Sequence, residues 1–157
     1  MLRLEFVEAK VVATATLLDY DAPAVCEAMW KGLEVPLEAR ATHAMASGQE
    51  IMINMPEVNR RFDPSSVPTQ NATIHPAPGD ILWTYLPPLY LKDFREGLWD
   101  FIVVYGQCIL TSRATGPIIS SNWAKIGEGF VDFATECAKT YVDGQKLLRV
   151  SRYEIGP

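Results

Sequence analysis

Hydrophobic and polar residues alternate over several short stretches of the chain, which is the pattern of half-buried β-strands. Residues 2–7, LRLEFV, place three apolar side chains on one face, those of Leu2, Leu4 and Phe6. Residues 10–19 continue with β-branched residues that alternate with alanine. The short link at Glu8 and Ala9 favours a hairpin between these two strands.

Further strands are predicted where β-branched and apolar runs lie between turn residues. Residues 37–55 contain two of them, on either side of the turn Ala46-Ser47-Gly48. A Pro-Gly-Asp turn leads into another strand, and Gly106 is expected to end the next one. The remaining strand segments are 81–86, 99–106, 118–126 and 145–154. The total is about eight short strands.

Two segments have the i, i+3, i+4 spacing of amphipathic helices. Residues 22–33 follow Asp21, an expected N-cap, and carry Pro23 in the first turn. Their apolar stripe is Ala22, Val25, Cys26, Met29, Trp30 and Leu33. Residues 128–142 carry a second stripe, Phe130, Phe133, Ala134, Cys137 and Tyr141. Two glycines, Gly127 and Gly129, let the chain turn sharply from the preceding strand into this helix.

Many antiparallel strands with one early and one late helix favour a mainly β fold. We predict a single domain over residues 1–157, a closed or nearly closed antiparallel β-barrel of about eight strands with two capping helices. Closure removes the exposed sheet edges, and each helix covers one open end. Two long irregular segments, 56–70 and 86–98, are expected to be functional or mobile loops.

Composition and charge narrow the classes of partner. The formal net charge is −5 and no Lys/Arg cluster occurs, so we expect no nucleic acid partner. No apolar run approaches the roughly 20 residues that span a bilayer, so we expect no membrane partner. Charged residues interrupt the N-terminal apolar stretch, which argues against a secretory signal and predicts a cytoplasmic protein. The three cysteines are widely spaced and no disulfide is expected, and the apolar helix positions of Cys26 and Cys137 predict buried free thiols there.

Several short motifs, unspecific singly, occur in a distinctive order over nearly the whole chain. They are Ala22-Pro23 through Cys26 with Met29-Trp30, His43 with Ser47, Gly48 and Glu50, His75-Pro76 through Gly79-Asp80, and Tyr105-Gly106. This order resembles the cyclophilin-like fold. It resembles still more closely a bacterial domain family of unknown function with that fold, a distant relative of the cyclophilins.

The resemblance does not carry the cyclophilin activity with it. Prolyl isomerisation in cyclophilins depends on an arginine within an FHR…FMxQGGD segment. The corresponding stretch here, ATHAMASGQEIMI, has Thr42 in place of the aromatic residue, Ala44 in place of the arginine, and no FMxQGGD element. Without a fixed cation, the barrier of about 18–20 kcal/mol falls less. We therefore expect no efficient peptidyl-prolyl cis-trans isomerase activity.

Seven residues are candidates for contact with a ligand: His43, Ser47, Glu50, His75, Tyr85, Tyr105 and Arg113. Histidine suits proton transfer near neutral pH, aromatic side chains suit the wall of a pocket, and Arg113 could hold a carboxylate through two hydrogen bonds. Each also has a structural alternative, in turn geometry, in core packing or as a solvated loop residue. The two histidines, Glu50 and Asp80 lack a tight metal-ligand spacing, so neither a metal nor a cofactor is expected.

The first functional hypothesis is a cyclophilin-like protein that binds an unknown small molecule at the barrel mouth. Whether it also transforms that molecule is left open, and the catalytic residues are unknown. The second is a protein–protein interaction module whose segments 56–70 and 86–98 bury against a partner or against another copy in a homo-oligomer. A residual prolyl isomerase is the third.

Overall fold

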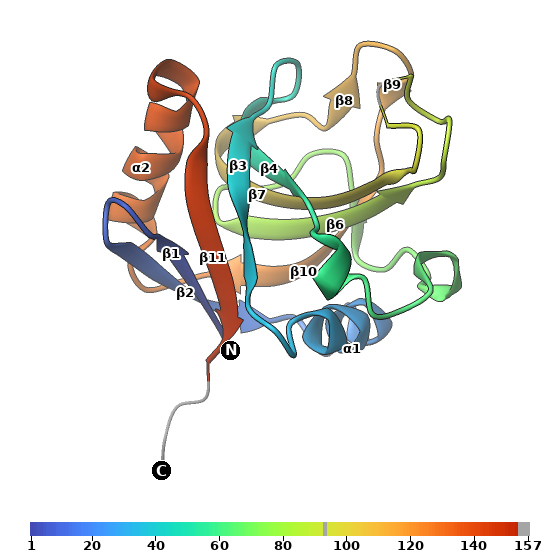
Figure 1. The fold of residues 1–157 in the computed structure, drawn as a ribbon, viewed down its shortest axis with the longest axis horizontal. Helices are drawn as coiled ribbons and strands as arrows, with labels where there is room; N and C mark the ends of the chain where they lie inside the picture. Colours follow the sequence, from blue (N-terminus) through green and yellow to red (C-terminus); the bar gives the residue numbers. More distant parts are fainter. Residues whose placement is uncertain (93, 154–157) are drawn as a thin grey trace.

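Eight strands form a closed antiparallel barrel in the computed structural model, which describes residues 1–92 and 94–153 (Figure 1). They are β1 (Leu2–Phe6), β2 (Val11–Leu17), β3 (Leu37–His43), β4 (Gly48–Asn54), β6 (Asp80–Leu86), β7 (Leu98–Cys108), β10 (Ser120–Ile126) and β11 (Lys146–Arg152). Their order is β2-β1-β11-β3-β4-β7-β6-β10, and β2 pairs with β10 to close the barrel. The predicted mainly β barrel is therefore confirmed.

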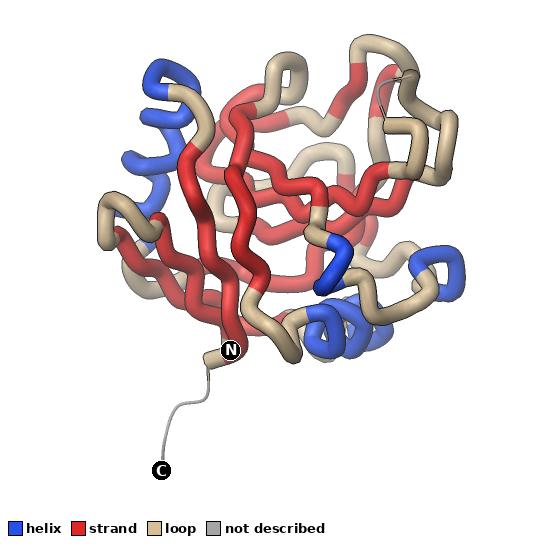
Figure 2. The backbone as a smooth tube through the Cα atoms, viewed as in Figure 1, coloured by secondary structure: helices blue, strands red, loops and turns tan. Residues whose placement is uncertain are grey.

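Three two-residue strands lie beside the barrel strands. β5 (Ala72–Thr73) pairs with β10. β8 (Thr111–Ser112) and β9 (Gly116–Pro117) pair with each other as a small separate sheet. Figure 2 shows that much of the chain between the main strands is loop, with two short 3₁₀ turns in the segment 56–70, η1 (Glu57–Asn59) and η2 (Pro64–Ser66).

One predicted strand boundary is wrong. β7 does not stop at Gly106 but continues to Cys108, which pairs with Gly48 of β4 beyond an irregularity in the register at Gln49. A side chain at Gly106 would collide with Gln49, whose Oε1 accepts a hydrogen bond from the Gln107 N–H at 2.8 Å. Glycine here allows Gln49 to lie across the strand. The predicted last strand ends at Arg152, and its expected final residue, Glu154, lies outside the described residues.

The two α-helices of the described chain are α1 (Pro23–Gly32) and α2 (Phe130–Asp143). They lie at different ends of the barrel, α1 below it and α2 at the upper left in Figure 1. The expected N-cap of α1 is wrong: Ala22 occupies that position and makes no side-chain cap. The side chain of Gln70, far along the chain, accepts hydrogen bonds from the N–H groups of Ala24 and Val25 at 2.8 and 3.3 Å.

The apolar stripe of α2 is narrower than predicted. Phe133 and Cys137 are fully buried, and Phe133 stacks on Phe6 of β1 with ring centroids 4.8 Å apart. Tyr141, in contrast, is 74% exposed. Glu136 is buried on this side of the helix, where Lys139 and Lys146 neutralise it at 2.7 and 2.6 Å.

Two apolar clusters hold the fold together. The larger one fills the barrel and includes the fully buried Phe101 and Trp123. The smaller one lies on the outer face of β4, β6 and β7, beneath the segment 109–119. Its members are Leu82, Ile102, Val104, Cys108 and Leu110, with Met52 and Ile118 packed against them. The three cysteines are buried free thiols, as predicted for Cys26 and Cys137.

In the described part of the chain, neither helix is long and apolar enough to cross a membrane.

Candidate functional site

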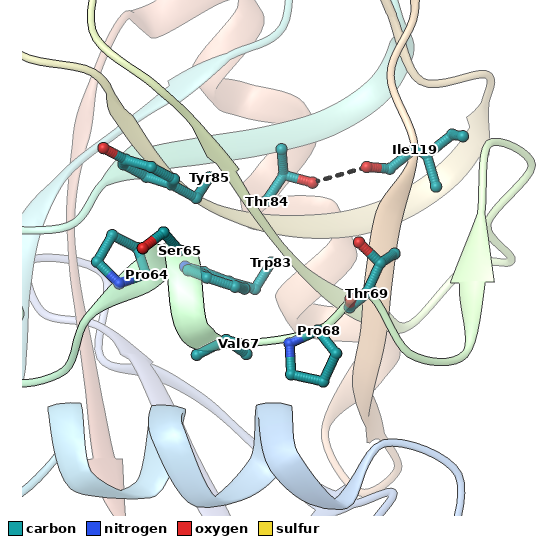
Figure 3. Close-up of a pocket in the computed structure, with 10 residues that line it drawn as sticks. Pro64, Ser65, Val67, Pro68, Thr69, Trp83, Thr84, Tyr85 and Ile119 are labelled. Carbon is teal, nitrogen blue, oxygen red and sulfur yellow. Dashed lines mark hydrogen bonds between the residues drawn. The ribbon is translucent and has the colours of Figure 1, made fainter.

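A cavity of about 230 Å³ lies between strand β6 and the segment 64–69 (Figure 3). Its apolar lining residues are Pro64, Val67, Pro68, Trp83, Tyr85 and Ile119, and its hydroxyl-bearing lining residues are Ser65, Thr69, Thr84 and Ser121. We call it the Trp83 cavity. The lining thus combines aromatic and aliphatic side chains with hydroxyl groups, and a concave site of this mixed kind can hold a small molecule.

Strand alternation positions the β6 side of the Trp83 cavity. Trp83 and Tyr85 point to one face of the strand and Thr84 to the other. Trp83 and Tyr85 belong to an aromatic group with Trp99, whose ring centroid lies 6.5 and 5.5 Å from theirs. Phe62 completes the group, 5.6 Å from Trp83. These packed rings leave the two β6 aromatics little freedom to move.

The opposite wall is held by hydrogen bonds to distant parts of the chain. The segment begins with the 3₁₀ turn η2 (Pro64–Ser66), which the side chain of Asp63 caps by accepting the Ser65 N–H at 2.9 Å. It ends at Gln70, whose N–H donates to Ser121 Oγ at 3.1 Å and whose side chain caps α1. A local cap therefore shapes the start of this wall, and its end is tied to β10 and to α1.

Trp83 contributes the most distinctive polar group. Its side chain is 4% exposed, yet the indole Nε1 has no hydrogen-bond partner among the described residues. Figure 3 shows the indole lying below Tyr85 with its nitrogen at the end that faces Ser65. A buried donor without a partner costs about 1–3 kcal/mol. An acceptor placed in the cavity would remove that cost.

The hydroxyl of Thr84 is already engaged within the protein. Its Oγ1 donates to the carbonyl oxygen of Ile119 at 3.1 Å, the contact drawn in Figure 3, and lies 2.5 Å from Ser120 Oγ. These contacts tie β6 to the chain that leads into β10. Thr84 therefore shapes the cavity, whereas the Trp83 N–H is a buried lining donor without a partner among the described residues.

His43 and Tyr105 form a separate pair at the α2 end of the barrel. His43 Nε2 lies 2.7 Å from the Tyr105 hydroxyl, and Nδ1 lies 2.7 Å from the Ala44 carbonyl oxygen. A carbonyl only accepts, so Nδ1 carries a proton and donates to Ala44, while Nε2 and the Tyr105 hydroxyl share the second hydrogen bond. Burial, and then the nearby Cys137, raises the pKa of Tyr105. The histidine is locked by its protein partners.

Glu50 is separated from His43 by the sheet. His43 is the cross-strand partner of Ile51 and shares its inward face, whereas Glu50 points outward into the smaller apolar cluster. Glu50 is 4% exposed, and its Oε2 accepts from the Cys108 thiol at 3.2 Å. Burial raises the pKa of Glu50, against the smaller opposing effect of the hydrogen bond from the Cys108 thiol.

Asp100 is a second buried carboxyl on the same outer face. It is 5% exposed, its Oδ1 has no hydrogen-bond partner in the described ranges, and its cross-strand neighbours are Thr84 and Asn54. Burial, and then the negative charge of Glu50, holds the pKa of Asp100 well above its ordinary value. Both carboxyls are therefore biased towards the neutral form.

The remaining candidates lie apart from one another. Ser47 Oγ donates to the Thr111 carbonyl at 3.0 Å and fastens the segment 109–119. His75 and Arg113 are exposed, His75 near β5 and Arg113 in the turn between β8 and β9. Of the seven sequence candidates, Tyr85 is the one that lines the Trp83 cavity. Within residues 1–92 and 94–153, no three His, Cys, Asp or Glu side chains converge as a metal site.

Neither Trp83 nor the four serine and threonine residues of the cavity are among the seven residues that the sequence pattern indicates. The useful signal was the long polar segment 56–70, which was expected to be functional or mobile and which supplies one wall. Nothing in its composition indicates which strand it covers.

The protein is thus a closed eight-stranded antiparallel β-barrel with a cavity beside strand β6. The chain belongs to the family described as "Protein of unknown function (DUF3830)", whose profile matches residues 4–152. Among solved structures, it is similar to the "Structure of McbB in complex with tryptophan", with a TM-score of 0.66 and 16% sequence identity. The similarity covers 100% of this chain and 46% of McbB, and at this identity it concerns the fold alone. Comparison with curated proteins finds no match.

Proposed function

We propose that the protein binds a small molecule in the Trp83 cavity. The observation that carries this proposal is the indole N–H of Trp83, which is buried against the cavity and lacks a protein partner in the described chain. A ligand with a hydrogen-bond acceptor and a flat apolar body fits such a lining, because the acceptor satisfies the indole and the body packs against Tyr85.

The size and charge of the cavity narrow the ligand. Its volume of about 230 Å³ lies below the roughly 300–1,000 Å³ of sites for drug-sized molecules, which favours a compact metabolite. The described lining side chains are aromatic, aliphatic or hydroxylic. The part of the ligand inside the cavity is therefore expected to be uncharged.

The similarity to McbB is compatible with this proposal. McbB was solved with tryptophan, a small molecule with a planar ring system. A barrel of this fold can therefore belong to a protein that binds such a molecule. The ligand of this chain is not inferred from McbB, since the two share 16% identity.

A thermal-shift screen of uncharged and aromatic metabolites tests the proposal. We expect at least one compound to raise the Tm of the unaltered protein. From the dependence of Tm on compound concentration, Trp83→Phe should weaken the apparent affinity about tenfold, the effect of one good hydrogen bond. Trp123→Phe is the matched control, because Trp123 is also a buried indole with an unpartnered Nε1 but does not line the cavity. Equal loss in both variants would contradict the proposal.

The relation to cyclophilins and the bacterial and cytoplasmic origin stay predictions. Ala44 occupies the place of the isomerase arginine in that resemblance, and its N–H donates to the Glu50 carbonyl at 3.1 Å. We accordingly expect turnover of a proline peptide far below that of an efficient cyclophilin. A rate equal to that of such an enzyme would overturn this expectation.

A protein–protein interaction module is the second candidate, and two side chains favour it. Leu89 and Tyr90, between β6 and β7, are 79% and 50% exposed. Large exposed apolar groups in neighbouring positions are typical of contact surfaces. Sedimentation of the protein and of Leu89→Asp tests this candidate: association that the substitution abolishes supports it, and a strict monomer without partners counts against it.

A further inference from the structure

A second cavity, of about 520 Å³, lies beside the end of β4. It is lined by Asn54, Arg60, Lys92, Phe94, Arg95, Glu96 and Gly97, and we call it the Arg60 cavity. Its described lining carries three cationic side chains and one carboxylate, although the whole chain has a formal net charge of −5; Asp93, in the same segment, lies outside the described residues. The local excess of positive charge is therefore opposite in sign to the charge of the molecule.

Arg60 is held in place by contacts on three sides. Its Nε donates to the Met55 carbonyl at 2.8 Å, and its Nη2 donates to Asn54 Oδ1 at 3.2 Å. The guanidinium carbon lies 5.6 Å from the ring centroid of Trp99. Asn54 Oδ1 also accepts the Trp99 N–H at 3.1 Å, so the residue that orients the arginine is itself fixed.

This arrangement leaves the guanidinium partly unused. A guanidinium has five N–H donors in a planar fork, and two of them are taken by Met55 and Asn54. Its neighbours Lys92 and Arg95 are exposed at the rim. A fixed arginine with free N–H donors, flanked by two exposed cations, is suited to a planar or tetrahedral oxyanion, because the fork can form two parallel hydrogen bonds.

We propose that the Arg60 cavity binds the oxyanion group of a ligand, a carboxylate or a phosphate. Arg60 positions the anion, and Lys92 and Arg95 add attraction at the rim. Phe94 supplies an apolar surface for the part of the ligand next to the charge. Glu96 opposes binding and favours ligands that also present a donor on that side. This site is independent of the Trp83 cavity, with which it shares no lining residue.

The test is a calorimetric titration of the full chain with inorganic phosphate and, separately, with acetate, at constant ionic strength set by chloride. We expect saturable binding of at least one of the two anions, and the tighter one identifies the chemical source. Arg60→Gln should weaken it about tenfold or more, the typical effect of losing charge-assisted hydrogen bonds. The affinity of Arg60→Lys should lie between that of the unaltered protein and that of Arg60→Gln, because lysine keeps the positive charge but lacks the planar guanidinium.

Arg61→Gln is the matched control. It removes the same charge at the next residue, but Arg61 pairs with Glu34 at 2.7 Å and does not line the cavity. Arg95→Gln keeps the test usable if Arg60→Gln does not fold, and it should also weaken binding. Absence of saturable binding, or an equal loss in the Arg60 and Arg61 variants, would overturn the proposal. Trp83→Phe should leave anion binding unchanged, which separates this result from that of the Trp83 cavity.

Discussion

The buried carboxyl of Asp100 dominates the electrostatics at the scale of single residues. Its pKa is raised, so the folded state holds a proton that the unfolded chain, with a pKa of about 3.9, releases more readily. The stabilising contribution of this group is therefore complete below about pH 4 and is lost as the pH rises through the folded-state pKa. The contribution of Glu50 to stability depends on pH in the same direction, because its pKa is raised as well.

Asp100→Asn should remove part of that pH dependence. The amide cannot ionise, so we expect similar stability of the variant and the unaltered protein near pH 4. At pH 8 the variant should be more stable by about 1–3 kcal/mol, since the unaltered chain must keep a poorly satisfied acid buried. Urea denaturation from pH 4 to pH 8 measures this, with exposed Asp21→Asn as the control. A difference in free energy of unfolding between the variant and the unaltered protein that stays constant from pH 4 to pH 8 would contradict the raised pKa of Asp100.

Single residues were also where the sequence was least informative. Gln70 caps α1 and anchors one wall of the Trp83 cavity, but it stands in a polar loop 46 residues from Ala24. Local pattern favoured Asp21 as the cap, because short-range propensity contains no information about partners that the fold brings in from elsewhere. The unpartnered indole of Trp83 was hidden for the same reason, since its surroundings come from a different segment.

At the scale of elements, the joint between β10 and α2 depends on one of its two glycines. Gly129 has φ of 78°, and a Cβ there would collide with the carbonyl oxygen of Val12. Gly127 has open space around its Cβ position. The sharp turn from wall to helix therefore requires glycine at 129 for both conformation and close approach.

Gly129→Ala should destabilise the fold by about 2–4 kcal/mol, through left-handed backbone strain and the clash with β2. Gly127→Ala should cost less than about 1 kcal/mol, because no neighbour obstructs the added methyl group. Chemical denaturation of both variants measures the difference. Equal losses would show that the joint is not constrained in the way described.

Element types were predictable because they depend on local periodicity. The strands on either side of Ser47 and both helices occur where their patterns indicated. The errors concern boundaries and faces. β7 passes through Gly106 because Gln49 fills the space above the glycine, and Tyr141 remains exposed because the barrel end accommodates Phe133 and Cys137 without it. Both depend on neighbours that are distant in sequence.

At the scale of the whole molecule, barrel closure followed from strand number and the small number of helices. The two cavities could not be predicted from the sequence, because each is formed where a long loop lies against a strand. The segment from Pro64 to Thr69 makes one wall of the Trp83 cavity, and residues 92 and 94–97 line the Arg60 cavity. Where such loops lie is decided by tertiary contacts. The sequence could indicate only that these two segments are long irregular loops, a kind of segment that often carries function.

Small-molecule binding at Trp83 is tested most directly by the indole N–H resonance of that residue in a ¹H–¹⁵N spectrum. The resonance is assigned by its loss in Trp83→Phe and is followed while a compound that stabilises the protein is added. We expect it to shift downfield in a saturable manner, because the N–H acquires an acceptor, while the indole of Trp123 stays in place. A stabilising compound that saturates the protein and leaves the Trp83 resonance unmoved would contradict the account.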